Sequence, residues 1–383
     1  MATIPTVSLR HHFAGLIDPR GERSRRHDLL DVIGLALCAV IAGAESWTAV
    51  EAYGHAKRDW LARHFRLPNG IPSHDTFRRV FCLLDPLAFQ SSFRDWIAAL
   101  AECGVGARRT IPIDGKTVRR SGRRGRGLAP LHLVSAWAGA DHLSLGQVAV
   151  DDKSNEITAI PRLLDLLDLK GALVTIDAMG CQKEIAAKIV AGGGDYILPV
   201  KDNQPHLHQD IDAGFMAALG TDFAGLEWSI ARTEETNRGR QEMRECHVIV
   251  RPAGLRDAAL WKGLAAICMV LSRRVVGGVV SEEFRYFIGS FAGTADEYLG
   301  AIRAHWGIEN SLHWVLDVVF REDESRHHSG NSCENLALMR KLAVGLLKQE
   351  KSSDASLKTK RLRCGWDDGY LAKVLAAKNV EGA

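Results

Sequence analysis

Two aspartates stand at the ends of short apolar segments that have the pattern of strands. Asp114 follows Thr110–Ile113, and Asp177 follows Ala172–Ile176. Binding and catalytic groups of α/β proteins gather at the ends of strands, but aspartate is also a common turn residue. Taken singly, each aspartate is better explained by a turn. Taken together, at corresponding ends of two strands, they favour a shared functional site.

A third carboxylate, Glu309, lies in a helix predicted over Ala295–Val319. Spacings of four residues place His305, Glu309 and His313 on one face of that helix. The neighbouring residues are too apolar for a purely solvated face. A zinc site from the two histidines is a weaker alternative, because the three residues do not form the H-E-x-x-H motif.

Three carboxylates that converge on one point repel one another, and divalent cations relieve that repulsion. Carboxylate oxygens with open coordination positions suit Mg²⁺ or Mn²⁺. Two such ions would activate a water or a 3′-hydroxyl and stabilise the leaving oxygen of a phosphodiester. The carboxylates therefore predict phosphoryl transfer on a nucleic acid. The basic segment 104–127 around Asp114 would hold that substrate, although a solvated loop explains the segment equally well.

The order of predicted elements around the aspartates is typical of an RNase H-like domain, in which a mixed sheet is flanked by helices. Three strands are followed by alternating helices and strands, and Asn155 can cap the first helix. The elements after the first strand are Leu131–Ala138, Leu143–Val150, the helix Glu156–Leu167, Ala172–Ile176, the helix Gln182–Ala191 and Tyr196–Val200.

The remaining segments suggest further parts of the chain. Residues 1–103 are predicted to be a helical domain. Its basic helices are compatible with DNA binding, but a plain helical bundle is the better explanation. Residues 104–204 and 296–350 form the predicted catalytic domain, 205–295 a β-rich insertion, and 351–383 a charged, loosely packed tail. The last two strands of the insertion are predicted to join across Gly277 and Gly278.

Composition and charge exclude several classes of protein. The 383 residues are 46% hydrophobic and 25% charged with a formal net charge of +3, which is ordinary for a globular protein. The apolar run Leu29–Ala44 is shorter than the roughly 20 residues of a membrane span, so it predicts a buried helix. Eight scattered cysteines without a C-x-x-C pair predict reduced thiols and a cytoplasmic location.

Five motifs, in this order, resemble the ISAs family of bacterial insertion-sequence transposases, which includes the H-repeat-associated proteins and belongs to the DDE superfamily. The motifs are Ile113–Arg119 (IDGKTVR), Lys153–Ile157 (KSNEI), Thr175–Gln182 (TIDAMGCQ), Lys201–Gln204 (KDNQ) and His305–Trp314 (HWGIENSLHW). The likeness covers nearly the whole chain. It implies that Asp114, Asp177 and Glu309 are a DDE triad holding two Mg²⁺ or Mn²⁺ ions. It also implies that 205–295 is the insertion of related transposases and that 7–100 is their associated N-terminal domain.

A set of polar side chains near these motifs is predicted to contact DNA. The set is Lys116, Arg119, Arg120, Lys201, Asn203, Gln204, Arg238, Arg240, His305 and His313. For Lys201, Asn203 and Gln204 a polar turn is an equally good explanation. The chain departs from the wider superfamily, whose Glu lies in a Y-x₂-R-x₃-E-x₆-K pattern. The matching positions here hold Ile302, His305 and Leu316, so His305 is the candidate replacement for the arginine.

The implied function is that of a DNA transposase. It would bind the terminal inverted repeats of its element, cleave at each end, and transfer the freed 3′-hydroxyl to target DNA. Its partners would be these DNAs and, when assembled on DNA, at least a second copy of the chain. No membrane partner is expected. The protein would act in the cytoplasm, in association with the nucleoid. The alternatives are a catalytically inactive DNA-binding remnant and a domesticated nuclease that nicks without joining.

Overall fold

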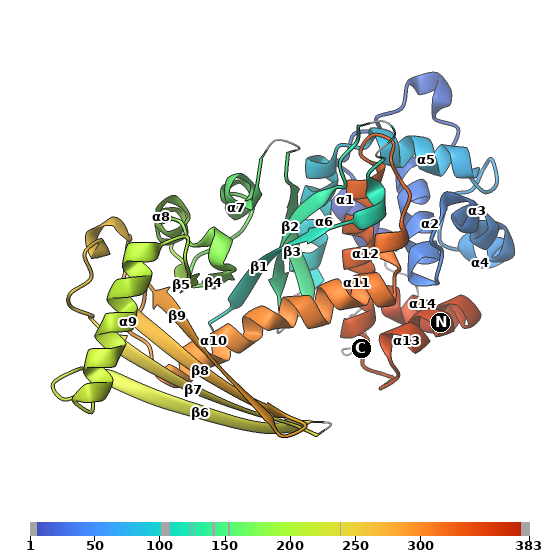
Figure 1. Ribbon diagram of the computed structural model, residues 1–383. Coiled ribbons are helices and arrows are strands. Elements are labelled where there is room, and N and C mark those ends of the chain that lie inside the picture. Colours follow the sequence, from blue (N-terminus) through green and yellow to red (C-terminus); the bar gives the residue numbers. More distant parts are fainter. Residues whose placement is uncertain are drawn as a thin grey trace. The chain divides into compact units, whose positions relative to one another are not determined.

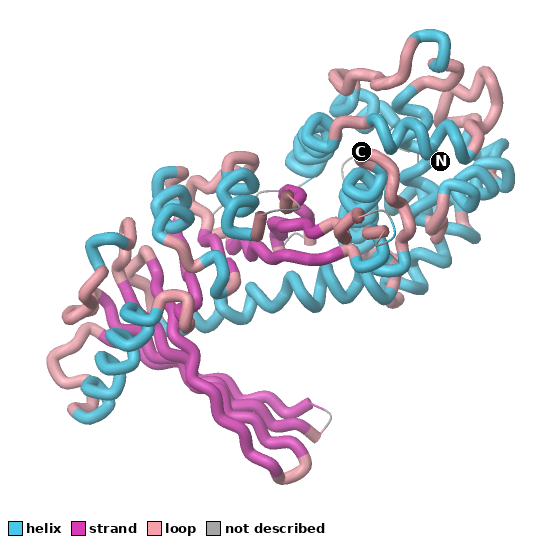
Figure 2. Tube along the Cα trace, turned by 45° about the horizontal axis from the view of Figure 1, so that its top comes forward, coloured by secondary structure: helices cyan, strands magenta, loops and turns pink. Residues whose placement is uncertain are grey.

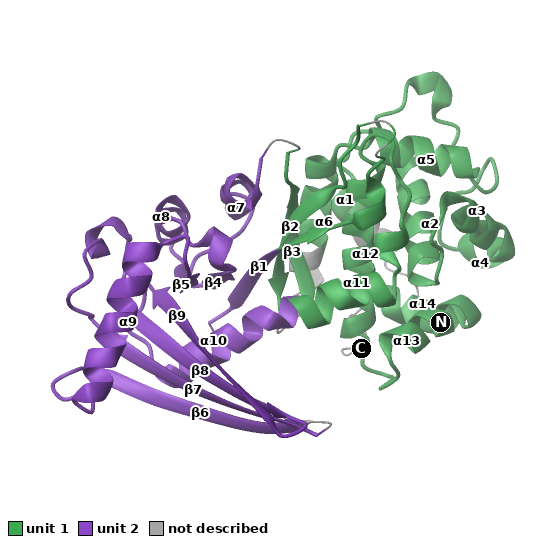
Figure 3. Ribbon diagram, viewed as in Figure 1, with its two compact units in different colours: residues 1–105, 115–152, 309–383 green, residues 106–114, 153–308 purple. Residues whose placement is uncertain are grey.

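The computed structural model describes residues 6–100, 108–123, 125, 127–139, 142–151, 154–237 and 239–376. Arg124, Arg126, Lys153, Arg238 and Cys103 lie outside these residues. The chain divides into two compact units (Figure 3). Unit 1 contains residues 1–105, 115–152 and 309–383, and unit 2 contains residues 106–114 and 153–308.

The strands of unit 2 have the order β1-β4-β5-β9-β8-β7-β6. Strands β1, β4 and β5 are parallel. The four insertion strands are antiparallel, and β9 pairs with β5, so the insertion extends the parallel part of the sheet. The bounds are β1 Thr110–Thr117, β4 Leu173–Ile176, β5 Asp195–Val200, β6 Trp228–Asn237, β7 Arg240–Val250, β8 Ala266–Val276 and β9 Val279–Gly289. Gly277 and Gly278 form the predicted turn, with φ of 56° and 81°, values that a two-residue hairpin turn of this kind requires.

Helices cover both faces of the unit 2 sheet. Helices α7 (Glu156–Leu164) and α8 (Lys183–Ala191) lie on one face, and α10 (Ala295–Ile308) crosses the other (Figures 1 and 2). Helix α9 spans Pro205–Gly220. Asn155 caps α7 as predicted, because its Oδ1 accepts a hydrogen bond from the Ile157 amide at 3.1 Å.

The core of unit 2 joins α10 to both parts of the sheet. Tyr298 and Ile302 of α10 pack with Leu173 of β4 and with Val248 and Val270 of the insertion. Each such side chain contributes about 1.5–3 kcal/mol when it leaves water. The insertion strands therefore help to hold the helix that leads to Glu309.

Unit 1 is mainly helical and is built around α12 (Ser332–Gln349), whose residues are almost all buried. Asn335 Nδ2 donates to the carbonyls of Phe81 at 3.0 Å and Leu84 at 2.9 Å, which ties the N-terminal helices to α12. The other elements are α1 Thr6–Phe13, α2 Leu29–Ile41, α3 Trp47–Ala56, α4 Arg58–Leu61, α5 His74–Leu83, α6 Pro86–Leu100 and the antiparallel pair β2 His132–Ala138 and β3 Leu143–Ala149. Within the described ranges, no helix is long and apolar enough to cross a membrane.

The C-terminal segment is described up to residue 376, and over residues 351–376 it is not loosely packed, so the prediction of a loose tail is wrong for this part. It forms α13 (Leu357–Trp366) and α14 (Asp368–Ala376), and Tyr370 of α14 donates to Glu350 Oε2 at 2.6 Å. The charged residues of α13 still take part in the core, since Arg361 is buried and donates to the Val40 carbonyl. Long basic side chains can bury their aliphatic stems in this way.

The long helix predicted over 295–319 is also not regular. Helix α10 ends at Ile308, a π-helical turn spans Glu309–His313, and α11 follows at Trp314–Val318. The buried residues explain the change. Ile308, Leu312, Leu316 and Phe320 are all 0% exposed and recur every four residues. An α-helix would rotate such a stripe by about 40° at each step, and one wider π turn corrects the drift. The sequence predicts that His305, Glu309 and His313 lie on one face of a regular α-helix. The π-helical turn that begins at Glu309 interrupts this regular α-helix.

Candidate active site

The register of two parallel strands brings Asp114 and Asp177 side by side in unit 2. Ile113 of β1 is opposite Ile176, the last residue of β4. The residue after Ile113 is Asp114, and the residue after Ile176 is Asp177. Neighbouring strands are about 4.8 Å apart. Because side chains alternate along a strand, Asp177 shares its face with Thr175. Thr175 Oγ1 lies 3.0 Å from His305 Nδ1, so this is the face that α10 crosses.

The turn after Asp177 is held by two residues that were predicted to contact DNA. Asn203 Nδ2 donates to the Ala178 carbonyl at 2.8 Å, and Gln204 Nε2 donates to the Cys181 carbonyl at 3.0 Å. Asp177 Oδ1 accepts from the Gly180 amide at 3.2 Å. Both amide side chains thus position the turn that carries Asp177. Lys201, just before them, is exposed.

Glu156, the first residue of α7, is a third acidic group beside Asp177 that the sequence reasoning did not single out. Helix α7 packs on the Asp177 turn through Ile160, one helical turn after Glu156. Burial raises the pKa of Asp177 above its ordinary value, and the negative charges of Glu156 and Asp114 raise it further. The sequence signal was the position of Glu156 within the KSNEI motif.

The close contact between α7 and this turn depends on a glycine. A Cβ added at Gly180 would lie 2.3 Å from Ile176 Cγ2 and 3.3 Å from Ile160 Cδ1. We expect Gly180→Ala to lower the free energy of unfolding by about 1–3 kcal/mol, because the strand or the helix must move.

Urea unfolding measures this effect, and Gly214→Ala in α9 is the matched control. A Cβ at Gly214 meets nothing within 4 Å, so that change should be neutral or stabilising. Equal losses in both variants would contradict the packing described here.

The acidic donors of unit 2 fit a divalent cation. Two adjacent carboxylates with a third acidic charge nearby repel one another when all are ionised. A divalent cation that prefers oxygen ligands relieves this repulsion. In the part of the chain that the structure describes, no group of three or more His, Cys, Asp or Glu side chains is arranged to hold an ion. The aspartate pair thus supplies only part of a ligand set.

The raised pKa of Asp177 predicts that its carboxylate lowers stability in the absence of metal. The folded-state pKa lies above the ordinary value of 3.8, so stability is lost as pH rises through the folded pKa. We expect Asp177→Asn, without metal at pH 7, to raise the free energy of unfolding by on the order of 1 kcal/mol. Asparagine keeps the acceptor for the Gly180 amide.

Thermal unfolding in chelator at pH 7 and near pH 4 tests this prediction. The gain should shrink near pH 4, because the folded-state carboxyl of Asp177, with its raised pKa, takes up a proton before the unfolded-state carboxyl does. The exposed Asp296 of α10 provides the control Asp296→Asn, which should show neither effect. A lower stability of Asp177→Asn at pH 7 would contradict the charge repulsion.

Glu309 is the residue that directly follows α10, and it belongs to unit 1. Its side chain is exposed. It opens the π-helical turn, a feature that is frequent at functional sites. His313 closes that turn and is partly buried.

Lys116 lies in an acidic cluster of unit 1 and is only 10% exposed at its side chain. Its Nζ is 2.7 Å from Asp317 and 3.3 Å from both Glu322 and Asp323. These carboxylates raise the pKa of Lys116 although burial acts in the opposite direction. The structure therefore places Lys116 in an internal ion-pair network.

The next two basic residues are accessible. Arg119 pairs with Asp323 at 3.1 Å, yet its side chain is 81% exposed. Arg120 is exposed in the same short 3-10 turn, Arg119–Ser121. Both remain available to a ligand from solvent.

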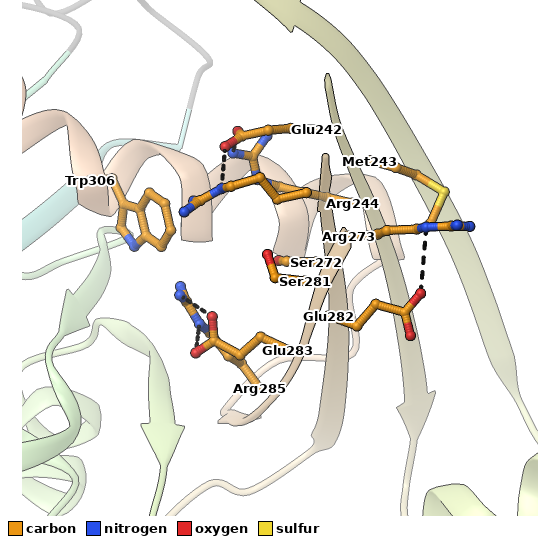
Figure 4. A pocket seen from close by; sticks show the side chains of 11 residues that line it. Glu242, Met243, Arg244, Ser272, Arg273, Ser281, Glu282, Glu283, Arg285 and Trp306 are labelled. Carbon is orange, nitrogen blue, oxygen red and sulfur yellow. Dashed lines mark hydrogen bonds and ion pairs between the residues drawn. The ribbon is translucent and has the colours of Figure 1, made fainter. Parts of the chain in front are cut away.

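The insertion presents a pocket of about 490 Å³ that the sequence reasoning did not find (Figure 4). Arginines and glutamates of β7, β8 and β9 line it beside Trp306 of α10. Arg285 lies over the Trp306 ring at 4.8 Å and pairs with Glu283 at 2.7 Å. Arg240, at the start of β7, pairs with Glu242 at the pocket wall. Arg238 lies outside the described residues.

Comparison with known proteins identifies the class. The family described as "Transposase DDE domain" matches residues 106–346, and the one described as "DDE_Tnp_1-associated" matches residues 10–97. The chain therefore belongs to the DDE transposase family.

Individual relatives agree with this assignment. "Putative transposase YncI" of Escherichia coli O157:H7 is 42% identical over 97% of this chain and 95% of its own length. "H repeat-associated putative transposase YhhI" of Escherichia coli K12 is 38% identical over 97% and 98%. A solved piggyBac transposase synaptic complex with hairpin DNA aligns with a TM-score of 0.43 and 9% identity, over 100% of this chain and 83% of that one. That structural likeness is too weak to support an argument.

Proposed function

We propose that this protein is the transposase of an insertion sequence, and that it binds the terminal inverted repeats, cleaves at each end and joins the freed 3′-hydroxyl to target DNA. The observation that carries this proposal is the β1–β4 register that sets Asp114 beside Asp177. It is supported by membership of the DDE transposase family, whose activity is DNA transposition.

Glu309 is proposed as the third member of the triad. The last turns of α10 are held on the aspartate face by the contact between His305 and Thr175. Tyr298 and Ile302 fix the same helix in the core. Glu309 follows α10 without a break, four residues after His305.

The three carboxylates would hold two divalent cations, Mg²⁺ or Mn²⁺. Such ions supply Lewis acidity to the scissile phosphate and lower the pKa of the attacking water or hydroxyl. The work of the chain is to hold the acids in register: β1 and β4 carry the aspartates, and Asn203 and Gln204 fix the Asp177 turn. His305 orients the end of α10 through Thr175.

The proposed fold of the catalytic part is RNase H-like, with residues 104–204 and 296–350 forming the domain and 205–295 the insertion. Strand order β1-β4-β5 in unit 2 and the antiparallel β2–β3 pair in unit 1 support it. Residues 1–103 remain the proposed N-terminal domain. Because the proposed substrate is chromosomal DNA, the place of action would be the cytoplasm.

DNA contacts are proposed for the accessible basic residues. Arg119, Arg120 and Lys201 are exposed near the ends of β1 and β5. Arg240 and the arginines of the insertion pocket offer a second phosphate-binding surface. DNA contacts are also proposed for Arg238, His305 and His313. Lys116, Asn203 and Gln204 are assigned a positioning role instead, since they pair with other residues of the protein.

A cleavage assay tests the proposal. Purified protein is incubated with labelled duplexes that carry the element ends and with a supercoiled target plasmid, in Mg²⁺ and in Ca²⁺. We expect cuts at the element boundary in Mg²⁺ alone, followed by joining of the 3′-ends to the plasmid. Joined products from two ends would indicate at least a dimer on DNA.

The alternatives give different products. Nicking without joining would indicate a domesticated nuclease. Binding without cleavage in either Mg²⁺ or Mn²⁺ would indicate a catalytically inactive remnant and would overturn the proposal.

A further inference from the structure

Unit 1 contains a second pocket, which we call the Trp47 pocket. It is an open hollow of about 920 Å³. Its walls come from the start of α3 at Trp47, from His74 and Arg78 of α5, from the segment Arg321–His327, and from Arg340 of α12. Four parts of the chain must fold together to form it.

The charges around the Trp47 pocket are mainly positive. Four arginines line it against two glutamates, and both glutamates pair with one of them, Arg321. Arg78 pairs with Asp75, which does not line the pocket. Arg326 is exposed and makes no ion pair or hydrogen bond with another described residue. The surplus of guanidinium groups would favour an anion.

Two buried donors at the wall lack acceptors in the described part of the chain. Arg340 is 3% exposed, and its Nη1 makes no hydrogen bond; the nearest carboxylate oxygen, from Glu322, is 3.8 Å away. Trp47 is 6% exposed, and its Nε1 is also unsatisfied. A buried donor without an acceptor costs about 1–3 kcal/mol. A ligand with several acceptor oxygens would remove that cost.

The rest of the wall is consistent with such a ligand. Helix α3 has ten residues and begins at the pocket, so its positive dipole end faces the hollow. His327 lies edge-on to Trp47 at 5.3 Å, and burial together with the charge of Arg340 lowers the pKa of His327 to about 4. The imidazole is therefore neutral near pH 7 and can donate a hydrogen bond without adding a charge.

We propose that the Trp47 pocket is a binding site for a phosphate group. Arginine guanidinium groups match the oxygens of phosphate in pairs, and helix N-termini bind the same group. The phosphate could belong to a DNA backbone or be free in solution, and both sources present the same oxygens to Arg340, Arg326 and Arg78.

A paired-variant experiment distinguishes these sources. The pocket variant is Arg78→Glu with Arg326→Glu. The control is Arg58→Glu with Arg63→Glu, which makes the same change in net charge at exposed residues outside the pocket. Binding of a 20-base-pair duplex and of inorganic phosphate is measured for each protein at one ionic strength, by polarisation and by calorimetry. Both changes are at exposed side chains, so folding should be preserved.

Each outcome assigns the Trp47 pocket to one phosphate source or rejects the proposal. A loss of DNA affinity of about tenfold in the pocket variant, with a change within about twofold in the control, supports a site for the DNA backbone. Loss of phosphate binding with unchanged DNA affinity supports a site for free phosphate. If the pocket variant matches the control in both measurements, the proposal is wrong. Arg340→Met tests the buried donor directly. It should weaken binding of the same ligand, duplex or inorganic phosphate, whose binding the pocket variant loses.

Discussion

Glu309→Gln is expected to lower strand cleavage at element ends by on the order of 10³-fold or more while leaving DNA binding within about twofold. Glutamine keeps the shape of the side chain but loses the negative charge that a metal ligand needs. Glu309 is exposed, so the change should not alter folding. Single-turnover cleavage and duplex binding by polarisation are the two measurements.

Glu22→Gln serves as the control for that variant. Glu22 is likewise an exposed glutamate of unit 1, in the short 3-10 turn Glu22–Ser24, and its change should leave both measurements unaltered. Cleavage that persists in Glu309→Gln would remove Glu309 from the triad. The nearby acids Asp317, Glu322 and Asp323 would not replace it readily, because Lys116 already pairs with all three.

Lys116→Met is expected to lower the free energy of unfolding by about 3 kcal/mol at pH 7. Without the ammonium group, Asp317 and Asp323 lose a close partner, and the 1%-exposed Glu322 keeps only Arg340 at 3.8 Å. The pKa of Lys116 is raised in the folded state, so its contribution is fully present at pH 7. It is lost only as pH rises through that folded pKa.

Urea unfolding followed by tryptophan fluorescence measures this loss. Adding Asp317→Asn to the Lys116→Met protein should recover part of the stability, and Lys116→Arg should retain most of it. The same proteins separate the two roles considered for Lys116. If Lys116→Met weakens DNA binding without changing stability, Lys116 is a phosphate contact and not an internal ion pair.

Several features could be predicted because their causes are local in sequence. Each aspartate follows an apolar run long enough for one strand, and the two runs proved to be adjacent parallel strands. Asn155 caps α7 because a side-chain acceptor directly precedes that helix. Gly277 and Gly278 turn because they can adopt positive φ.

Other features depend on residues that the fold brings from far along the chain. The sequence around Lys116 predicts a DNA contact, because its partner Asp323 is 207 residues away and their pairing leaves no local signal. Asn203 and Gln204 donate to a turn more than 20 residues earlier. The Trp47 pocket combines four separate parts of the chain in the same way.

The π turn at Glu309 is a different case, because its signal was present in the sequence. Ile308, Leu312, Leu316 and Phe320 repeat every four residues, a period too long for a straight α-helix. The charges of the C-terminal segment predict a solvated chain, but Tyr370 belongs to the buried side of α14.

Asp114, Asp177 and Glu309 are proposed to serve one metal site, and a count of the Mn²⁺ ions bound by the protein checks this proposal. The protein is saturated with element-end DNA and titrated with Mn²⁺, and free Mn²⁺ is followed by electron paramagnetic resonance. We expect two ions for the wild-type chain and the Asp296→Asn control, and loss of at least one tight ion in Asp177→Asn and in Glu309→Gln alike. Two ions bound by Glu309→Gln with wild-type affinity would contradict it.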